Sequence, residues 1–353
     1  MNAGEPALTN PHRYDFASDN TAPAMPEAMD AILRFNTGFA AGYGDDNICE
    51  QAADLIRGLL DADAAVRFTA SGTAANALSL AALAQPHEAV IAHEHAHIVT
   101  DEAGAPGFFG GGMGLIALPG ASGKIDTASL VGTPARPDKA HLHSPDHAHA
   151  QPAAALSVTN ATEYGTVYSQ AEVAAIANAV KSTGRSLHLD GARLANAAAA
   201  GFDVKCLAKL GFDIVILGGT KAGGTPTEAI VLLNRDLERR FGARMKHGGQ
   251  LVSKARFLAA PWIGMLETGA WSGRAAHANA MAQRLAAAML FKLNHAVEAN
   301  AVFVEMDEAA HERLDAAGWH AYRFIDGSVR FMCSWATTVE GVDALAASLK
   351  AIV

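Results

Sequence analysis

The sequence predicts an α/β fold: a mostly parallel β-sheet covered by helices on both faces, followed by a smaller α+β domain. Three observations predict it. Short β-rich runs alternate with alanine-rich segments of helical period. Most of these runs are apolar without alternation, as expected of parallel strands buried on both faces. The pattern changes near Asp236, so we divide the chain into an amino-terminal extension (1–17), a large α/β domain (18–265) and a small α+β domain (266–353).

The individual elements follow from the same patterns in chain order. Short β-rich runs predict strands over Ala65–Thr69, Ala89–Ala92, Gly114–Leu118, Ala154–Thr159, Ser186–Leu189, Ile214–Leu217 and Ala229–Leu233. Segments of helical period predict helices that include Pro26–Phe35, Asn47–Leu60, Thr73–Leu83, Gln170–Ser182 and Ala192–Ala199. Beyond them we predict helices over Arg235–Leu266, Ser272–Asn294 and Gly341–Ile352, and strands over Ala301–Glu305, Trp319–Ile325 and Ser328–Trp335. The stretch Pro134–Pro152 is predicted to be an exposed loop.

Composition and charge exclude several classes of protein. The chain has 353 residues, of which 50% are hydrophobic and 18% charged, so it can bury a continuous core. A net charge of −9 and the lack of a basic run argue against nucleic-acid binding. The three cysteines form no CxxC pair, which predicts neither disulfides nor a thiolate zinc site. Without a signal-peptide pattern or an apolar stretch of about 18 residues, we expect a soluble cytoplasmic protein without membrane contact.

The first candidate site motif is Ala70–Asn76, which follows a predicted strand and opens a helix. Its small residues would expose backbone N–H groups at the positive end of the helix dipole, and Ser71 and Thr73 would add hydroxyl donors beside Gly72. Such a helix end suits a phosphate dianion. An ordinary serine or threonine helix cap explains the same residues, so this motif alone leaves both interpretations open.

Two further motifs end successive predicted strands. In LHLDGAR, Asp190 and Arg193 lie at the carboxyl end of a strand, where ligand sites of open α/β sheets cluster. A buried aspartate there needs a cationic partner, although an Asp190–Arg193 pair or a helix cap also accounts for it. In GGTKAGG, Lys221 lies among glycines next to Thr220, a setting that should depress the pKa of its amine, as imine formation requires. A structural lysine bound to a loop carbonyl is the alternative.

Together the three motifs indicate a pyridoxal phosphate site. A phosphate-binding helix end, an acid to pair with a pyridinium nitrogen and an imine-forming lysine are the groups with which a protein binds and tunes that cofactor. Each motif has a structural explanation, but all three occur at strand ends of one chain. We therefore predict pyridoxal 5'-phosphate as the cofactor and no metal ion in the site.

Six segments carry a family resemblance. In the order SDN, YGDD, SGTAAN, HIVTDEAGAP, LHLDGAR and GGTKAGG, they resemble the fold-type I pyridoxal phosphate enzymes of the L-threonine aldolase and β-eliminating lyase family. The resemblance runs from about Phe16 onward and implies an aspartate aminotransferase-like three-layer sandwich. It implies that Lys221 forms the imine and that Asp190 pairs with the pyridine nitrogen. The residues that it implies around the cofactor phosphate and the lysine are Ser71, Gly72, Thr73 and Thr220.

The resemblance also implies a histidine stacked on the cofactor ring, five residues before a glutamate. His97 and Glu102 have this spacing. A near-neutral imidazole at that place could accept the proton of a substrate β-hydroxyl group. His93 and His95 would then be strand-end or surface residues. A zinc site made from the three histidines is the weaker interpretation, because it requires the segment to be extended.

An arginine for the substrate carboxylate is expected in the pattern SVRFMCSW. A guanidinium fork matches a carboxylate bidentately, and Arg330 is our choice over Arg323; a surface strand arginine is the alternative. The resemblance implies that Arg193 contacts the cofactor's O3′ or the same carboxylate. Ser18 and Tyr43 match family positions that line the site, Tyr43 from a neighbouring subunit. The resemblance therefore implies a homo-oligomer, which is a dimer at minimum and is expected to be a tetramer.

Two features depart from the family pattern. Many members carry a second active-site histidine where this chain reads TNATEYG (159–165), so the general base and the diastereomer preference stay open. The predicted loop also contains a histidine tract, which we interpret as a solvated insertion with metal binding as the alternative. Its histidines are His141, His143, His147 and His149.

The predicted reaction is cleavage of L-threonine, L-allo-threonine or a related L-β-hydroxy-α-amino acid such as phenylserine into glycine and an aldehyde. Arg330, with Ser18 or Arg193, would hold the carboxylate, and His97 or a water that it positions would take the β-hydroxyl proton. β-Elimination on a β-substituted L-amino acid is the alternative activity, with pyruvate and ammonia as products. A pyridoxal-binding protein without turnover is the non-enzymatic alternative, and the lysine, aspartate and arginine set argues against it. The sequence does not decide between methyl and aryl β-substituents.

Overall fold

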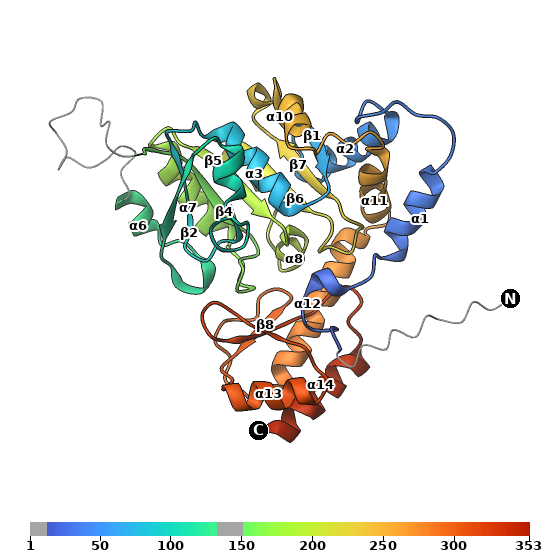
Figure 1. Cartoon of the computed structure of the whole chain (residues 1–353), viewed down its shortest axis with the longest axis vertical. Coiled ribbons are helices and arrows are strands. Elements are labelled where there is room, and N and C mark those ends of the chain that lie inside the picture. The colour runs from blue at the N-terminus through green and yellow to red at the C-terminus, as the bar shows by residue number, and fades with distance from the viewer. Residues whose placement is uncertain (1–12, 133–150) are drawn as a thin grey trace.

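A computed structural model describes residues 13–132 and 151–353, and the predicted α/β fold is confirmed in it. Figure 1 shows a large part, in which helices surround a sheet, and a smaller part that contains the carboxyl-terminal helices. Most of the predicted loop Pro134–Pro152 lies outside the described residues. The same is true of its histidines His141, His143, His147 and His149.

The large sheet of the described chain has seven strands in the order β1-β7-β6-β5-β4-β2-β3. Its strands are β1 (Ala65–Thr69), β2 (Ala89–His93), β3 (Gly114–Leu118), β4 (Ala153–Thr159), β5 (Ser186–Gly191), β6 (Ile214–Gly218) and β7 (Glu228–Leu232). All pairs are parallel except those of β7, which is antiparallel to both β1 and β6. Each strand overlaps a predicted one, so the mostly parallel sheet is confirmed.

Helices cover both faces of this sheet, which makes three layers. Those of the large part are α1 (Pro26–Phe35), α2 (Asn47–Leu60), α3 (Gly72–Leu83), α4 (His97–Thr100), α5 (Ala105–Phe109), α6 (Thr127–Gly132), α7 (Gln170–Lys181), α8 (Leu194–Ala199), α9 (Cys206–Leu210), α10 (Phe241–His247) and α11 (Arg256–Glu267). Ile214 and Ile216 of β6 pack with α3 and α10, whereas Val215 and Leu217 pack with α2, α7 and α11. Because successive side chains of a strand point to opposite faces, both sets must be apolar, which explains the lack of alternation.

A second core belongs to the smaller part. It lies between a three-stranded sheet, in the order β8 (Ala301–Val304), β10 (Val329–Met332), β9 (Tyr322–Arg323), and helices α12 (Ala270–Ala288), α13 (Glu308–Ala316) and α14 (Val339–Ile352). Figure 1 shows α12 passing from the large part into the smaller one. Phe16, from the amino-terminal segment, is buried in this core beside Trp319, and its carbonyl accepts the N–H of Met332 at 2.8 Å. The domain boundaries at residues 17 and 265 stay a prediction.

The single helix predicted over Arg235–Leu266 is wrong. The structure has a short 3-10 turn, η4 (Arg235–Leu237), then α10 and α11. Arg240 and Gly249 have φ angles of 75° and 70°, in the left-handed region that a continuous α-helix excludes. The strand predicted over Trp319–Ile325 is also too long, because pairing with β10 covers Tyr322–Arg323.

The carboxyl ends of the parallel strands meet at one edge of the large sheet. There Thr159 of β4 lies opposite Asp190 of β5, and Gly218 of β6 lies opposite Glu228. Because β7 is antiparallel to its neighbours, it begins at this edge. Its first residue, Glu228, therefore lies beside the last residues of the parallel strands. Ligands of open α/β sheets bind at this edge.

Candidate active site

A cavity of about 50 Å³ lies at the carboxyl edge of the large sheet. Residues from distant segments line it: Gly72, Asn76, His97, Thr159, Glu163, Asp190, Ala192, Arg193, Ile216, Lys221 and Glu228. Five of these are residues that the sequence predicts for the site, namely Gly72, His97, Asp190, Arg193 and Lys221. The structure therefore brings together the helix end, the acid and the lysine that the sequence places on separate strand ends.

Lys221 lies in the turn that follows β6. Its neighbour Thr220 fixes this turn, because the Thr220 N–H donates to the Thr227 carbonyl and the Thr227 N–H donates to the Thr220 hydroxyl, both at 3.1 Å. Burial and the Arg193 guanidinium lower the pKa of Lys221. A lower pKa leaves more of the amine neutral at a given pH, which is the form that attacks a carbonyl carbon. The lowered pKa that the sequence predicts for Lys221 therefore agrees with its buried position beside Arg193.

A chain of hydrogen bonds joins Asp190 to His97. Asn76 Nδ2 donates to Asp190 Oδ2 and to Glu102 Oε1, both at 2.8 Å. Glu102 Oε1 lies 2.9 Å from His97 Nδ1, and this contact raises the pKa of His97. The Ala192 N–H donates to the other Asp190 oxygen at 3.0 Å. One buried amide therefore fixes both the aspartate and the glutamate that orients the histidine.

Arg193 pairs with an acid to which the sequence analysis assigns no role. Its Nε and Nη2 donate to Asp19 Oδ2 and Oδ1 at 2.7 and 2.9 Å, a bidentate ion pair. Burial alone would raise the pKa of Asp19, but the guanidinium outweighs it and lowers this pKa to about 2. Arg193 thus pairs with Asp19 and not with Asp190, its alternative partner in the sequence.

The predicted phosphate-binding segment is the amino end of α3. Ser71 is the N-cap residue, and its hydroxyl accepts the N–H of Ala74 at 3.3 Å, so the cap interpretation is confirmed. Ser71 is exposed, and Gly72 and Thr73 are half-buried. A Cβ built on Gly72 would meet no atom within 4 Å. The helix end therefore has open space for an anion.

Arg330 lies on β10 of the smaller part. Its guanidinium carbon is 5.4 Å from the ring centre of Phe324 and 5.8 Å from that of Tyr322. Its buried Nε has no hydrogen-bond partner among the described residues. Burial and the nearby Arg193 lower the pKa of Arg330 to about 10. A buried guanidinium without an anionic partner is unfavourable, which suits a site that receives an anion.

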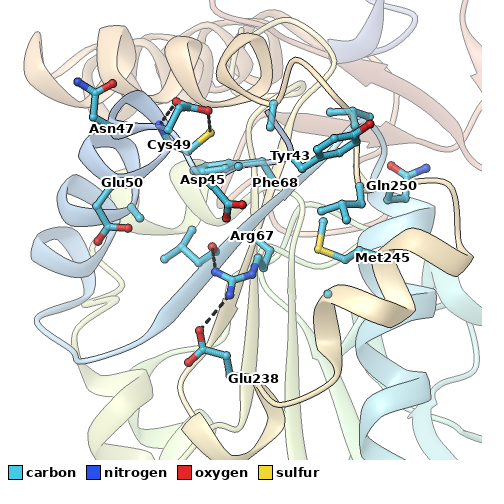
Figure 2. A pocket seen from close by; sticks show the side chains of 18 residues that line it. Tyr43, Asp45, Asn47, Cys49, Glu50, Arg67, Phe68, Glu238, Met245 and Gln250 are labelled. Atoms are coloured by element: carbon cyan, nitrogen blue, oxygen red, sulfur yellow. Dashed lines mark hydrogen bonds and ion pairs between the residues drawn. The ribbon is translucent and has the colours of Figure 1, made fainter. Parts of the chain in front are cut away.

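Two predicted substrate residues do not line the cavity. Ser18 caps the short 3-10 turn η1 (Asp19–Thr21), and its hydroxyl accepts the Asn20 N–H at 3.2 Å. Tyr43 lines a different pocket of about 800 Å³ between β1, α2 and α10 (Figure 2). Its side chain is 49% exposed, and Lys246 Nζ lies 4.9 Å from its ring centre. A contribution of Tyr43 to a neighbouring subunit stays a prediction.

The three histidines of the zinc alternative, His93, His95 and His97, have separate partners in the structure. His93 Nε2 lies 3.0 Å from the Gly120 carbonyl and His95 Nδ1 lies 2.6 Å from the Tyr164 hydroxyl, so these histidines have other partners than His97. Residues 13–132 and 151–353 hold no group of three or more His, Cys, Asp or Glu able to bind a metal ion. In the same ranges, no helix is both long and apolar enough to span a membrane.

Four acidic or amide residues at or near the cavity have no assigned role in the sequence analysis: Asp19, Asn76, Glu163 and Glu228. Asp19, Asn76 and Glu163 fall within segments singled out there, SDN, SGTAAN and TNATEYG. The sequence therefore indicates these segments, but it does not indicate the contacts that the three residues make. For Glu228 the only sequence signal is that an acidic residue directly precedes the apolar run Ala229–Leu233. Glu228 accepts the Gly219 N–H at 2.7 Å, and burial raises the pKa of Glu228 to about 7.

The fold and the site define a class of protein, the fold-type I pyridoxal phosphate enzymes. The histidinol-phosphate aminotransferase from Clostridium acetobutylicum has the same fold, with a TM-score of 0.71 over 96% of this chain and 98% of that one, at 13% identity. This likeness concerns the fold alone. It confirms the aspartate aminotransferase-like architecture that the sequence predicts.

Within this class, the chain belongs to the beta-eliminating lyase family, whose model matches residues 15–309. It is 43% identical to the low specificity L-threonine aldolase of Pseudomonas aeruginosa, over 97% of this chain and 98% of that protein. A solved structure of the Leishmania major threonine aldolase has a TM-score of 0.88 at 29% identity, covering 97% of this chain and 100% of that one. The predicted family is confirmed, and the chain is an enzyme of the lyase class.

Proposed function

We propose that this protein is a pyridoxal 5'-phosphate-dependent aldolase that cleaves L-threonine, L-allo-threonine and related L-β-hydroxy-α-amino acids, phenylserine included, to glycine and an aldehyde. The observation that carries the proposal is one cavity lined by Lys221, the buried Asp190 and Arg193. The names of the Pseudomonas aeruginosa and Leishmania major relatives support the choice of substrate.

The residues present fit the cofactor. Asp190 is a buried carboxylate whose hydrogen-bond donors, Asn76 and Ala192, are neutral, so the protonated ring nitrogen would be its cationic partner. Lys221 would bond the cofactor covalently, with Thr220 fixing the turn, and His97 would cover the ring. The open end of α3, at Ser71, Gly72 and Thr73, would hold the phosphate. When bound, the cofactor withdraws electrons from the α-carbon of an amino acid.

Two guanidinium groups would hold the substrate carboxylate. Arg330 supplies a buried Nε without a partner, and Arg193 is already oriented by its ion pair with Asp19. Ser18 lies next to that aspartate in the chain and would add its hydroxyl. A substrate fixed at its carboxylate and amine presents its β-hydroxyl to the remaining cavity wall, where His97 or a water that it positions is the proton acceptor favoured by the sequence.

The proposal is tested with the purified protein, supplied with pyridoxal phosphate and incubated with L-threonine. We expect acetaldehyde and glycine in equal amounts, the aldehyde followed by a coupled alcohol dehydrogenase and the glycine by amino-acid analysis. A 2-oxo acid with ammonia would instead establish the alternative, β-elimination. If the protein with bound cofactor forms neither pair of products, both activities are contradicted.

We also propose that the enzyme is a cytoplasmic homo-oligomer, a dimer at minimum and a tetramer as the expected form. Tyr43 supports this, since its half-exposed side chain lies outside the cavity of its own chain. The described cysteines are all free, which agrees with a reducing compartment. Light scattering on the purified enzyme should give at least twice the mass of one chain. An active monomer would contradict the proposal.

Replacing Arg330 with lysine should weaken substrate binding. A lysine retains the charge and loses the fork that matches a carboxylate, so we expect the KM for L-threonine to rise about 10- to 100-fold with cofactor occupancy unchanged. Arg323→Lys is the matched control on the adjacent strand, because Arg323 donates to the carbonyls of Gly327 and Met306. Equal KM values for the two variants would argue against a carboxylate site at Arg330.

Replacing Asn76 with alanine should disturb both ends of the hydrogen-bond chain. Asp190 and Glu102 would each lose a buried donor, at a cost of about 1–3 kcal/mol in the free energy of unfolding, and pyridoxal phosphate affinity should fall. Thermal unfolding and cofactor titration measure the two effects. Asn234→Ala is the control, since Asn234 donates to Asp213 at 2.8 Å near the opposite edge of the sheet. The Asn234→Ala variant should lose stability and retain its affinity for pyridoxal phosphate. If Asn76→Ala also lost stability without losing cofactor affinity, Asn76 would have a structural role alone.

A further inference from the structure

Glu163 lies in the loop after β4 and lines the active-site cavity. Its Oε1 accepts two hydrogen bonds, from the His97 backbone N–H at 2.9 Å and from the Thr159 hydroxyl at 3.0 Å. These two donors come from α4 and from the end of β4. They hold the carboxyl group in a fixed place beside the histidine.

The other oxygen of this carboxyl group, Oε2, is buried and has no hydrogen-bond partner among the described residues. Leaving a buried carboxylate oxygen unpaired is unfavourable, and such an atom in a native protein calls for an explanation. Burial raises the pKa of Glu163, so the group takes up a proton more readily than an exposed glutamate does. An O–H donor entering the cavity would satisfy Oε2.

The other groups of the cavity are less suited to receive a hydroxyl proton. Asp190 is occupied by two N–H donors, and Glu228 begins β7 and accepts the Gly219 N–H. His97 Nδ1 is bound to Glu102, which leaves Nε2 as the competing acceptor, but this contact raises the pKa of His97 and so leaves less of the ring neutral at a given pH. Among the described acids that line the cavity, Glu163 has the one buried oxygen without a partner.

We propose that Glu163 binds the β-hydroxyl group of the substrate and accepts its proton during carbon–carbon cleavage. The inference rests on the proposed aldolase function and replaces His97 in this one task. Glu163 and Arg193 line the same cavity, so one substrate can contact both. His97 would still cover the cofactor ring.

In the proposed cleavage, Glu163 holds the proton of the β-hydroxyl group only for a time. The O–H bond breaks and its proton passes to Glu163 Oε2, while the O–H electron pair becomes the second bond of the aldehyde C=O. The Cα–Cβ bond breaks, and its electron pair stays with Cα. One proton is then added to Cα, and Glu163 loses the one that it received, so that threonine gives glycine and acetaldehyde without an oxidant or reductant.

The test compares a reaction that needs the β-hydroxyl with one that does not. Glu163→Gln keeps an oxygen for the His97 and Thr159 donors and cannot serve as a carboxylate base. We expect L-threonine cleavage to fall about 10²-fold or more, mainly in kcat, whereas exchange of the glycine α-hydrogen with deuterated solvent should change less than about threefold. Both rates are measured at equal cofactor occupancy.

Glu298→Gln is the matched control. Glu298 also accepts a backbone N–H, from Val167 at 2.6 Å, and it is exposed and outside the cavity, so both rates should stay unchanged. If Glu163→Gln does not fold, Glu163→Asp takes its place: the shorter carboxylate should slow cleavage at least about tenfold more than exchange.

The outcomes separate the two proposals. A parallel fall of cleavage and exchange in the Glu163 variant would show a merely structural role, and an unchanged cleavage rate would show no role; either overturns the inference and leaves the aldolase function standing. If the unsubstituted enzyme exchanges the glycine hydrogen and cleaves no β-hydroxy amino acid, the proposed function itself is wrong.

Discussion

Replacing Lys221 with alanine should abolish covalent attachment of pyridoxal phosphate and lower the rate of L-threonine cleavage by more than about 10³-fold. Lys221 lines the cavity, and burial together with Arg193 lowers its pKa, so it is the amine that can attack the cofactor's aldehyde. The alanine variant keeps Asp190 and the end of α3 and should still bind the cofactor noncovalently. The visible absorbance of the bound cofactor, before and after borohydride, distinguishes the two modes of binding.

A surface lysine provides the control for this experiment. Lys124 binds Glu172 at 3.0 Å on the exterior of the large part, and Lys124→Ala should retain both the covalent cofactor and the activity. If borohydride still fixed the cofactor to the Lys221→Ala protein, another amine would carry the attachment. The cavity around Lys221 would then be assigned to a different ligand.

Replacing Asp190 with asparagine should lower the cleavage rate about 10²- to 10³-fold. The variant keeps the shape of the side chain and the hydrogen bond from Ala192, and it removes the negative charge that would stabilise the protonated ring nitrogen. Asparagine also places an amide opposite the Asn76 donor, where the carboxylate accepts at 2.8 Å. Steady-state kinetics with L-threonine and a cofactor titration, run together, measure the two consequences.

Asp213→Asn is the matched substitution at the other edge of the sheet. Asp213 accepts the Leu187 N–H at 2.8 Å and an Asn234 amide at 2.8 Å, so it has a similar structural environment. Its replacement should lower stability and leave the cleavage rate unchanged in the folded fraction. A rate for Asp190→Asn within a factor of about three of this control would argue against a charge-dependent role for Asp190.

Much of the fold is predictable because each strand of the large sheet is a local feature. A short apolar run such as Ile214–Gly218 is buried on both faces, and its composition alone reports that burial. The region 235–266 is not predictable in this way. Its helical period continues through Arg240 and Gly249, whose left-handed backbone breaks the helix. Glycine carries a signal for that conformation, but arginine carries none, so the break at Arg240 could not be predicted.

In the site, too, some features are predictable from the sequence and others are not. Lys221, Asp190 and His97 are predictable because each lies in a short motif whose residue types match a known chemical task. The contacts that orient them are not, because they join residues far apart in the sequence: Asn76 and Asp190 are 114 residues apart, and Asp19 and Arg193 are 174 apart. The partners of a polar side chain are set by the tertiary fold, which residue spacing does not report.

The burial of Phe16 in the carboxyl-terminal core has a consequence for how the protein is made. This segment leaves the ribosome long before its partners Trp319 and Met332 are translated. The large sheet can form on the emerging chain, since domains generally fold as they are completed. Phe16 must wait until Trp319 and Met332 have been translated before it can be buried. We therefore expect nascent chains that have not reached Trp319 to expose this segment to chaperones, and the Asp19–Arg193 ion pair to form once the segment packs.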